Sequence, residues 1–500
     1  MTDSSTVVAG YRTGGATTED PHHARRWLIL VVIALAQLMV VLDATIVNIA
    51  LPSAQQDLGF SSDARQWVVT AYALAFGSLL LLGGRVADLF GRKYALLIGL
   101  SGFAVASVVG GAAANFEMLV IARAAQGVFG ALLAPAALSL LTTTFTDVKE
   151  RGRAFGIFGA IAGGGAAIGL LLGGVLTEYL DWRWCMFVNI IIAVIALFGG
   201  LTLLRHRPSE HRPKLDIPGT LSASAGLFAV VYGFSNAETH DWSSATVWGF
   251  LVAGVALLGL FVVLQTRVSH PLLPLRVVLD RNRGGAYLAV FMLGIGMFGI
   301  FLFLTYYLQQ NLGFSPIMSG LAFLPMVGTL MISATTATAM LLPRFGPRPL
   351  VALGMLIAGG GMFWFSGIDT SSTYASGVLF PLLVTGVGIG LSMAPSMNVA
   401  TMGVDRHDAG VASATVNTAQ QIGGSIGTAL LSSIASGAVT SFVAGRQLTP
   451  QLAAEAAIHS YSTAFTWSAV IFVAGAVICG LLLKPGVAEQ QGESTAAIHM

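Results

Sequence analysis

The segment WLILVVIALAQLMVVLDATIVNIAL, residues 27–51, contains one ionisable side chain, the carboxyl group of Asp43. A helix needs about 20 apolar residues to cross a hydrocarbon layer roughly 30 Å thick. The segment therefore predicts a transmembrane helix with an acid in its second half. The rest of the chain determines how many such helices there are and what this acid contacts.

The composition is that of a membrane protein. Of the 500 residues, 55% are hydrophobic and 10% are charged, whereas soluble domains carry about 25% charged residues. Basic and acidic residues number 25 and 23, so the basic excess of nucleic-acid-binding proteins is missing and no nucleic-acid partner is expected. Cys185 and Cys479 lie too far apart in sequence for a metal-ligand spacing or a disulfide framework. We expect no metal and no cofactor. Residues 1–24 lack an apolar stretch, so no cleavable signal peptide is expected.

Fourteen runs are long and apolar enough to span a bilayer. The run at 218–236 is the weakest, because it is short and rich in small residues. The predicted spans are 27–51, 67–87, 94–114, 118–141, 154–176, 185–204, 218–236, 244–266, 284–310, 316–342, 349–368, 375–399, 409–436 and 463–484.

The positions of Lys and Arg predict the orientation, because cytoplasmic loops carry an excess of both. With the amino terminus inside, the outer loops hold Arg65, Arg183 and Arg446, one further base, Arg123, lies within a span, and the other 21 of the 25 lie on the inner side. This alternation favours fourteen spans with both termini cytoplasmic. We expect a multi-pass protein of the bacterial inner (cytoplasmic) membrane.

Two long inner loops, 205–218 and 267–284, separate a pair of spans from six before and six after. The expected fold is an all-α polytopic membrane protein with 14 transmembrane helices as 6+2+6. ADLFGRKYALLIG and MLLPRFGPRPLVALG occupy matching places in the two halves, which fits the repeated halves of secondary transporters, although two basic turns would look alike by chance. The expected division is a cytoplasmic tail 1–26, a six-helix half 27–204, a linker with two extra helices 205–283, a second half 284–485 and a tail 486–500.

Asp43 and Arg123 are the ionisable residues well inside the predicted spans. A charge at the centre of a membrane helix costs about 2.5 to 3.5 kcal/mol on insertion scales, so it usually faces a cavity or a partner. If Arg123 approaches Asp43 in only one conformation, the proton affinity of the acid depends on conformation, and proton flow can drive a cycle. The alternative is an acid that merely joins two helices.

Three stretches resemble signatures of the major facilitator superfamily, in particular its fourteen-span drug:proton antiporter branch of the EmrB/QacA type. They are LDATIVNIALP at 42–52, GRVADLFGRK at 84–93 and RAAQG at 123–127. The resemblance extends over nearly the whole chain and implies the major facilitator fold. It makes Asp43 the proton-coupling acid and Arg123 the base linked to proton transfer.

The resemblance also implies an inner gate between spans 2 and 3. Asp88 ends one helix and Arg92 begins the next, and the helix dipoles disfavour both charges there. Asp88 is therefore expected to pair with Arg92 or with another helix end, and a solvated turn is the alternative. The gate signature matches at Gly84, Asp88, Gly91, Arg92 and Lys93.

Span 5 carries Gly165, Gly169 and Gly173 at intervals of four residues, which allows another helix to approach closely. Ordinary bundle packing would need the same glycines. The antiporter motif of the family has Gly-Pro before a glycine pair, and here Leu170 follows Gly169 before Gly173 and Gly174. We therefore expect close helix packing along these glycines of span 5 and no proline kink in it.

A substrate cavity should lie between the halves, although each of its candidate residues could equally face lipid. The second half lacks an acid in its predicted spans, so lipophilic monocations or neutral compounds fit better than dications. The candidate cavity residues are Met39, Asn48, Gln126, Tyr306, Tyr307, Asn398, Asn417 and Gln420.

These features together predict a monomeric, proton-coupled exporter of lipophilic compounds that works by alternating access. An exporter of one defined metabolite or antibiotic, or an uncoupled facilitator, is the alternative. An enzyme is not expected, because the spans offer one acid and one base instead of a catalytic cluster.

Overall fold

The computed structural model describes residues 25–61, 64–145, 147–205, 216–240, 242–404, 408–447 and 449–486. Every element in these residues is helical, and 14 of the helices are long and apolar enough to cross a membrane. The predicted fold class and number of spans are confirmed. The weakest predicted run, 218–236, forms a full helix, α7 (Ile217–His240).

The membrane helices form two sets of six with a pair between them. The first set is α1 (Arg26–Leu58), α2 (Gln66–Phe90), α3 (Arg92–Gly111), α4 (Phe116–Thr144), α5 (Val148–Tyr179) and α6 (Trp184–Leu203). Between the sets lie α7, α8 (Ala245–Arg267) and the short α9 (Leu275–Val278). The second set is α10 (Arg281–Tyr306) with η1 (Tyr307–Asn311), α11 (Pro316–Thr336) with η2 (Ala337–Leu341) and α12 (Leu342–Phe345), α13 (Pro347–Phe365), η3 (Tyr374–Leu379) with α14 (Phe380–Thr401), α15 (Ala409–Val443) and α16 (Pro450–Leu482).

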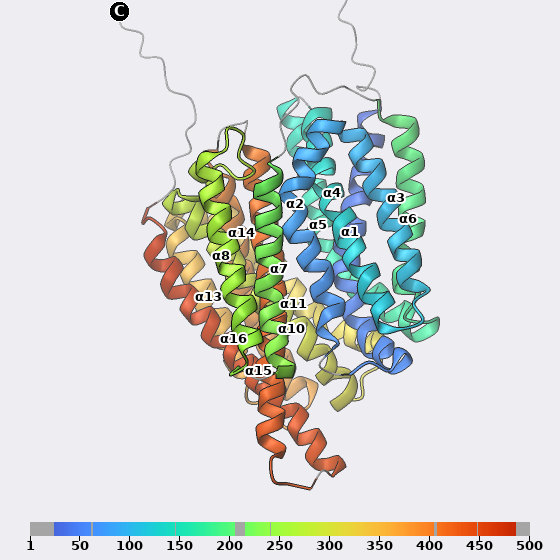
Figure 1. Cartoon of the computed structure of the whole chain (residues 1–500), viewed down its shortest axis with the longest axis vertical. Coiled ribbons are helices and arrows are strands. Elements are labelled where there is room, and N and C mark those ends of the chain that lie inside the picture. The colour runs from blue at the N-terminus through green and yellow to red at the C-terminus, as the bar shows by residue number, and fades with distance from the viewer. Residues whose placement is uncertain are drawn as a thin grey trace, which may run out of the picture.

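The two six-helix halves stand side by side, and α7 and α8 lie against one flank (Figure 1). Across the boundary, α2 packs against α15 and α5 packs against α11. Helix α7 contacts both α2 and α15, where Val231 joins Leu74 and Ile422 in one buried cluster. The extra pair therefore covers one of the two lines along which the halves meet, and α8 lies outside α7.

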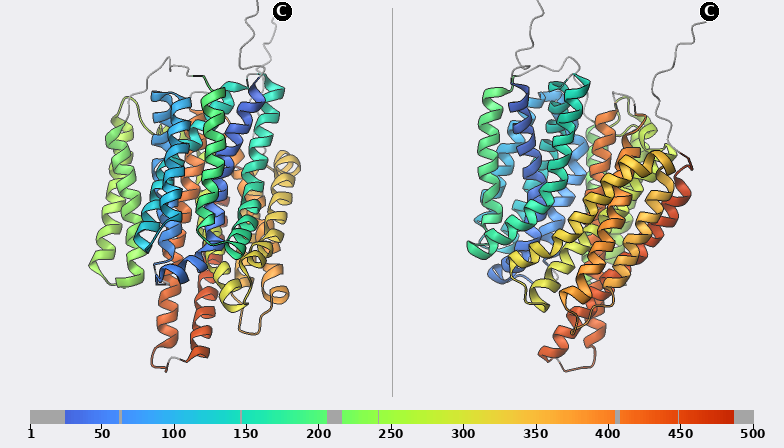
Figure 2. Two further views of the ribbon diagram at one scale, coloured as in Figure 1. Left: turned by 90° about the vertical axis from the view of Figure 1, so that its right-hand side faces the viewer. Right: turned by 180° about the vertical axis from the view of Figure 1, so that it is seen from behind.

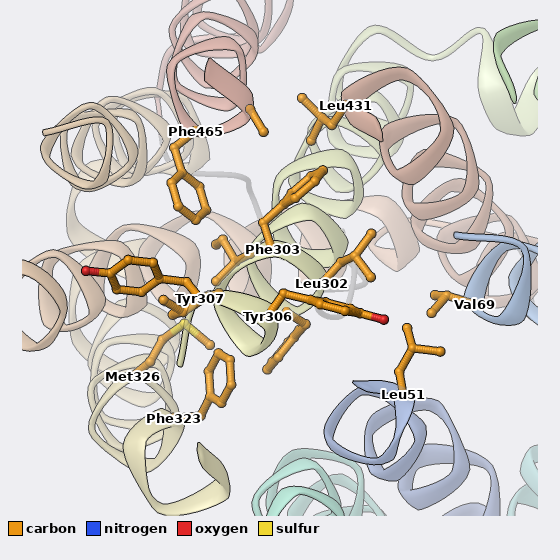
Figure 3. Close-up of a cluster of buried hydrophobic side chains, with 14 of the residues drawn as sticks. Leu51, Val69, Leu302, Phe303, Tyr306, Tyr307, Phe323, Met326, Leu431 and Phe465 are labelled. Carbon is orange, nitrogen blue, oxygen red and sulfur yellow. The ribbon is translucent and has the colours of Figure 1, made fainter. Parts of the chain in front are cut away.

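The halves lean apart toward the end of the molecule where α1 begins and α16 ends (Figure 2, right). At the opposite end, which we call the closed end, they are joined by hydrogen bonds. Tyr306 Oη donates to Gln55 Oε1 at 2.6 Å, and Gln309 Nε2 donates to the carbonyl oxygen of Ile49 at 3.0 Å. Figure 3 shows Tyr306 reaching from its helix toward Leu51 and Val69 of the first half. The helix ends at this side therefore seal the space between the halves.

The last two helices are longer than the sequence suggests. The predicted spans 409–436 and 463–484 correspond to Ala409–Val443 and Pro450–Leu482, so both helices extend beyond the predicted spans. The two extensions form a hairpin that projects beyond the other helices (Figure 1, bottom). The start of α16 has a sound local cause, because Thr449 caps the N–H of Leu452, Pro450 occupies the first turn and alanines follow. Hydropathy misses such a helix because it extends outside the apolar run.

The arginines predicted in the outer loops all have partners at the closed end or beyond it. Arg183 donates to Asp57 Oδ2 at 2.8 Å and to the carbonyl oxygen of Ala113 at 2.5 Å, which joins three helix ends of the first half. Arg446 lies over the ring of Phe442. Arg65 lies 4.1 Å from the ring centroid of Tyr306, across the boundary between the halves. Each of the three arginines in the predicted outer loops therefore makes a local structural contact.

Candidate functional site

Asp43 lies at the centre of a fully buried polar cluster in the first half. Its side chain is 0% exposed, and Arg123 on α4 donates Nη1–H to Asp43 Oδ2 at 2.5 Å. The structure thus brings together the two ionisable residues that the sequence placed inside the spans. A buried ion pair of this kind needs further hydrogen bonds to offset the loss of hydration.

Those further bonds come from two amides. Gln126 Nε2 and Asn189 Nδ2 both donate to Asp43 Oδ1, at 2.9 and 2.8 Å. Gln126 also accepts from Arg123 Nη1 at 2.8 Å and donates to Ser107 at 2.8 Å. The carboxylate is therefore held by three donors, and an ionised carboxylate only accepts.

Arg123 is held on its remaining sides by α2. Its Nε donates to the carbonyl oxygen of Val68 at 3.0 Å, and its guanidinium lies 4.5 Å from the ring centroid of Tyr72. This contact is a cation–π interaction, which strengthens when it is desolvated. The cluster therefore draws on α1, α2, α3, α4 and α6 of one half.

The stretch RAAQG explains how α4 forms this site. Arg123 and Gln126 are three residues apart, so their side chains share one helix face. Gly127 follows, and a Cβ there would lie 2.5 Å from the carbonyl oxygen of Tyr72. The glycine lets α4 approach α2 closely enough for Arg123 to reach Val68.

Three members of the cluster were not found from the sequence: Ser107, Tyr72 and Asn189. Asn189 had a usable signal, because it is an amide inside the otherwise apolar run of α6. Gln126 was expected in a substrate cavity, but it is 0% exposed and bonded to Asp43, so that placement is corrected.

The expected inner gate is only partly described. Gly91 joins α2 to α3 with a φ of 95°, which favours glycine, and Gly84 lies beside Pro135 of α4. The side chain of Asp88 lies outside the described residues, so its pairing with Arg92 stays a prediction. Lys93 Nζ donates to the carbonyl oxygens of Leu201 and Leu204 at the end of α6, where a cation is favourable. The gating role of Lys93 stays a prediction.

The glycines of α5 lie at two different contacts. A Cβ on Gly165, Gly169 or Gly173 would meet atoms of α1 at 3.1, 2.0 and 2.9 Å. Gly174 instead faces α11 of the other half, where a Cβ would lie 2.7 Å from Pro316 O. Three of the four therefore pack within the first half, and Gly174 packs between the halves.

Leu170 occupies the place of the motif proline and lies on the same contact. Its side chain is buried, and its carbonyl oxygen faces Gly320 of α11, where a Cβ would lie 2.5 Å away. Gly174 and Gly320 thus let α5 and α11 approach reciprocally at the closed end.

The expected cavity residues are scattered. Met39 is buried in the core of the first half, and Asn48 donates to Ala44 O of its own helix. Tyr306 and Tyr307 are buried in the core at the closed end, and they point in opposite directions (Figure 3). These four therefore line no open space in this conformation. The others are exposed or half-buried on α14 and α15: Asn398, Asn417 and Gln420.

No metal site is found within the described residues, where no three His, Cys, Asp or Glu side chains group together. The cluster around Asp43 is instead a buried acid whose charge is balanced by one base and two amides.

Two six-helix halves with two further membrane helices between them, and an ion pair buried in one half, define a membrane transporter. The chain belongs to the Major Facilitator Superfamily, whose profile matches residues 33–428. It is 48% identical to the puromycin resistance protein pur8 of Streptomyces alboniger, over 94% of both chains. It is 38% identical to the cephamycin export protein CmcT of Amycolatopsis lactamdurans, over 91% of this chain and 92% of that one.

Solved structures share the fold at low sequence identity. A bacterial homologue of the human lysosomal transporter Spinster, in an inward-facing and unoccupied conformation, matches with a TM-score of 0.65 and 17% identity over 93% of this chain and 97% of that one. A D-xylose-proton symporter matches with a TM-score of 0.62 and 16% identity over 92% and 98%. The family expected from the three sequence signatures is confirmed.

Proposed function

We propose that the protein exports lipophilic compounds from the cell in exchange for protons, with Asp43 as the proton carrier and Arg123 as its counter-ion. The observation that carries this proposal is the fully buried pair at 2.5 Å, supported by two amides. The relatives named for resistance and export support the direction of transport.

The proposed cycle uses the conformation seen here as the inward-facing state. Both termini then lie in the cytoplasm, and the closed end faces outward. Asp43 has no contact with solvent in this state and is paired with Arg123. Opening of the closed end would admit a proton from outside, and its release inside would need a further rearrangement of the helices that cover Asp43 here. The chain would work as a monomer in the cytoplasmic membrane, with halves at 27–204 and 284–485 and the linker at 205–283.

The second half suggests the substrate class. The described residues of α11, α14 and α15 include no ionisable side chain, whereas half-buried amides are present at Asn417 and Gln420. A neutral compound could bind there without an unpaired charge, and a lipophilic monocation would leave one unpaired charge where a dication would leave two. Release of protons on addition of substrate to proteoliposomes, measured over a panel of dyes and antibiotics under an imposed pH gradient, tests this proposal. Transport that does not depend on the pH gradient would indicate an uncoupled facilitator.

A second candidate function is export of one antibiotic made by the producing cell. It is favoured by the relatives, because pur8 and CmcT are each named for a single compound. The same panel separates the two: one accepted compound indicates a dedicated exporter, and several unrelated ones indicate multidrug efflux.

We expect Arg65→Gln to weaken the closed end. The guanidinium of Arg65 lies 4.1 and 5.9 Å from the ring centroids of Tyr306 and Phe303 in the other half. A cation–π contact is worth about 0.5 to 2 kcal/mol, so its loss should raise the ratio of open to closed molecules about 2- to 30-fold. Spin labels at Ser61 and Ser371 measure that ratio as a distance distribution.

Arg183→Gln is the matched control for Arg65→Gln. It removes the same charge at the same end of the protein, but the contacts of Arg183 with Asp57 and Ala113 lie within one half. Its distance distribution should equal that of the wild type. An unchanged distribution in Arg65→Gln would contradict the role of this contact in closure.

Gly174→Ala should also open the closed end, by a steric route. The added Cβ would lie 2.7 Å from backbone atoms of Pro316 and Ile317, which cannot move aside as a side chain can. We expect a longer distance between the same two labels and slower transport. Gly164→Ala on the same helix is the control, since its Cβ would meet nothing within 4 Å. The same label distance and transport rate in both variants would contradict a role of the Gly174 contact in closure.

A further inference from the structure

Asn189 is the member of the cluster whose hydrogen bonding is incomplete. Its Nδ2 donates to Asp43 Oδ1 at 2.8 Å, while its Oδ1 is buried and has no hydrogen-bond partner among the described residues. The side chain is 0% exposed. An unsatisfied buried acceptor costs about 1 to 3 kcal/mol, so its presence beside a titrating acid calls for a physical reason.

A proton on Asp43 meets donors at both oxygens. Oδ2 faces Arg123 Nη1, and arginine has no acceptor. Oδ1 faces the N–H groups of Gln126 and Asn189. A protonated acid therefore needs one of the two amides to turn its oxygen toward it.

Gln126 cannot turn without losing other bonds. Its Oε1 accepts from Arg123 and its Nε2 donates to Ser107, so a reversal would set two donors, Nε2 and Nη1, against each other. Asn189 makes one bond through Nδ2 and none through Oδ1. A half-turn of the Asn189 amide therefore places Oδ1 instead of Nδ2 beside Asp43, and it breaks no other hydrogen bond of Asn189.

We propose that Asn189 is the positioning residue that adapts the site to both protonation states of Asp43. It donates Nδ2–H to the carboxylate, and after a half-turn of its amide it accepts the O–H of the protonated acid through Oδ1. The only bond made is O–H on Asp43 Oδ1, with the proton taken from water at the outer side and later returned to water inside. This inference rests on the proposed role of Asp43.

The other groups around Asp43 are accounted for. Arg123 of α4 is paired with Asp43, Tyr72 of α2 lies against the Arg123 guanidinium, and Cys185 of α6 contacts Thr177 and Gly173 O. Helix α11 has no charged residue, and the charged residues of α5 and α10 lie near the ends of those helices. Asn189 is therefore the group whose change affects Asp43 without altering the charge of the site.

The test is Asn189→Leu, which keeps the approximate size and removes both donor and acceptor. A hydrogen bond to an ionised group is roughly twice as strong as a neutral one, so the charged form loses more. The pH of half-maximal transport in proteoliposomes should move upward, equivalent to about a tenfold lower proton concentration. Thr305→Val is the matched control, because the buried hydroxyl of Thr305 donates to Phe301 O of its own helix, and its midpoint should match the wild type.

Infrared difference spectroscopy of the purified protein gives a readout independent of transport. The C=O stretching band of the protonated acid, identified by its loss in Asp43→Asn, should move to higher frequency in Asn189→Leu, because its O–H has lost an acceptor. An unchanged band together with an unchanged midpoint would overturn the inference. If the leucine variant fails to fold, Asn189→Ala removes the same donor and the same acceptor.

The two hypotheses fail differently. Transport by Asp43→Asn that still follows the pH gradient would refute the proposed function, and the infrared band would still report the contact between Asp43 and Asn189. A wild-type band position together with a wild-type midpoint in Asn189→Leu would refute the inference and leave the proposed function standing.

Discussion

Asp43→Asn should reduce pH-driven transport to the background of empty vesicles while substrate binding remains. The carboxylate is the one acid in the cluster, and the three side chains bonded to it cannot take over its role as proton acceptor, because the guanidinium of Arg123 has no acceptor and the amides of Gln126 and Asn189 do not titrate. Uptake into inverted vesicles with an imposed gradient measures transport, and ligand-induced quenching of tryptophan fluorescence measures binding.

Asp57→Asn is the matched control for Asp43→Asn. It makes the same exchange on the same helix, at an acid whose side chain is 47% exposed and paired with Arg183 at the closed end. Exposed ion pairs are worth about 0 to 1 kcal/mol, so this variant should fold and transport. Gradient-driven uptake by Asp43→Asn at the wild-type rate would remove Asp43 from the coupling role.

Arg123→Ala should have the second-largest effect, because it leaves the carboxylate buried without its counter-ion. Breaking a buried pair in this way costs about 3 to 5 kcal/mol unless the remaining charge is neutralised. We expect Asp43 to hold its proton in this variant, so that coupled uptake stops while proton-independent exchange of substrate continues. Comparison of gradient-driven uptake with substrate counterflow distinguishes these two modes.

Arg123→Lys should restore uptake only partly. Lysine supplies the charge at Asp43, but a single ammonium cannot also reach Val68 O and Gln126 Oε1 as the guanidinium fork does. We expect a coupled rate between those of the alanine variant and the wild type. Full activity with lysine would show that charge alone is required, and that the hydrogen bonds to α2 and within α4 serve folding only.

The burial of the pair has a consequence for the cycle. Asp43 is 0% exposed in a conformation whose halves lean apart toward the termini. Proton exchange therefore requires another arrangement of the helices, and the closed end is the part that must open. The contacts of Arg65 and Gly174 lie at that end, so the variants proposed for them test whether opening limits proton entry.

Most of the fold could be predicted from the sequence. The bilayer imposes a length on each apolar run, and loop charge imposes an alternation, so fourteen spans and the 6+2+6 order required no long-range information. The same reasoning missed the α15–α16 hairpin, because helices that leave the membrane lose the apolar signal. It also placed Tyr306 and Tyr307 in a cavity, since hydropathy cannot tell a side chain facing a cavity from one packed in a closed seam.

The sequence alone indicated that Asp43 and Arg123 face a cavity or a partner instead of lipid, because an isolated charge inside a membrane helix is costly. Only the tertiary structure decided which partners those are. Asn189 is 146 residues from Asp43 and Gln126 is 83 residues away, and their bonds depend on how α1, α4 and α6 are rotated about their axes. That rotation is set by close packing at residues such as Gly127 and Gly169, a property of helix pairs that no single helix encodes.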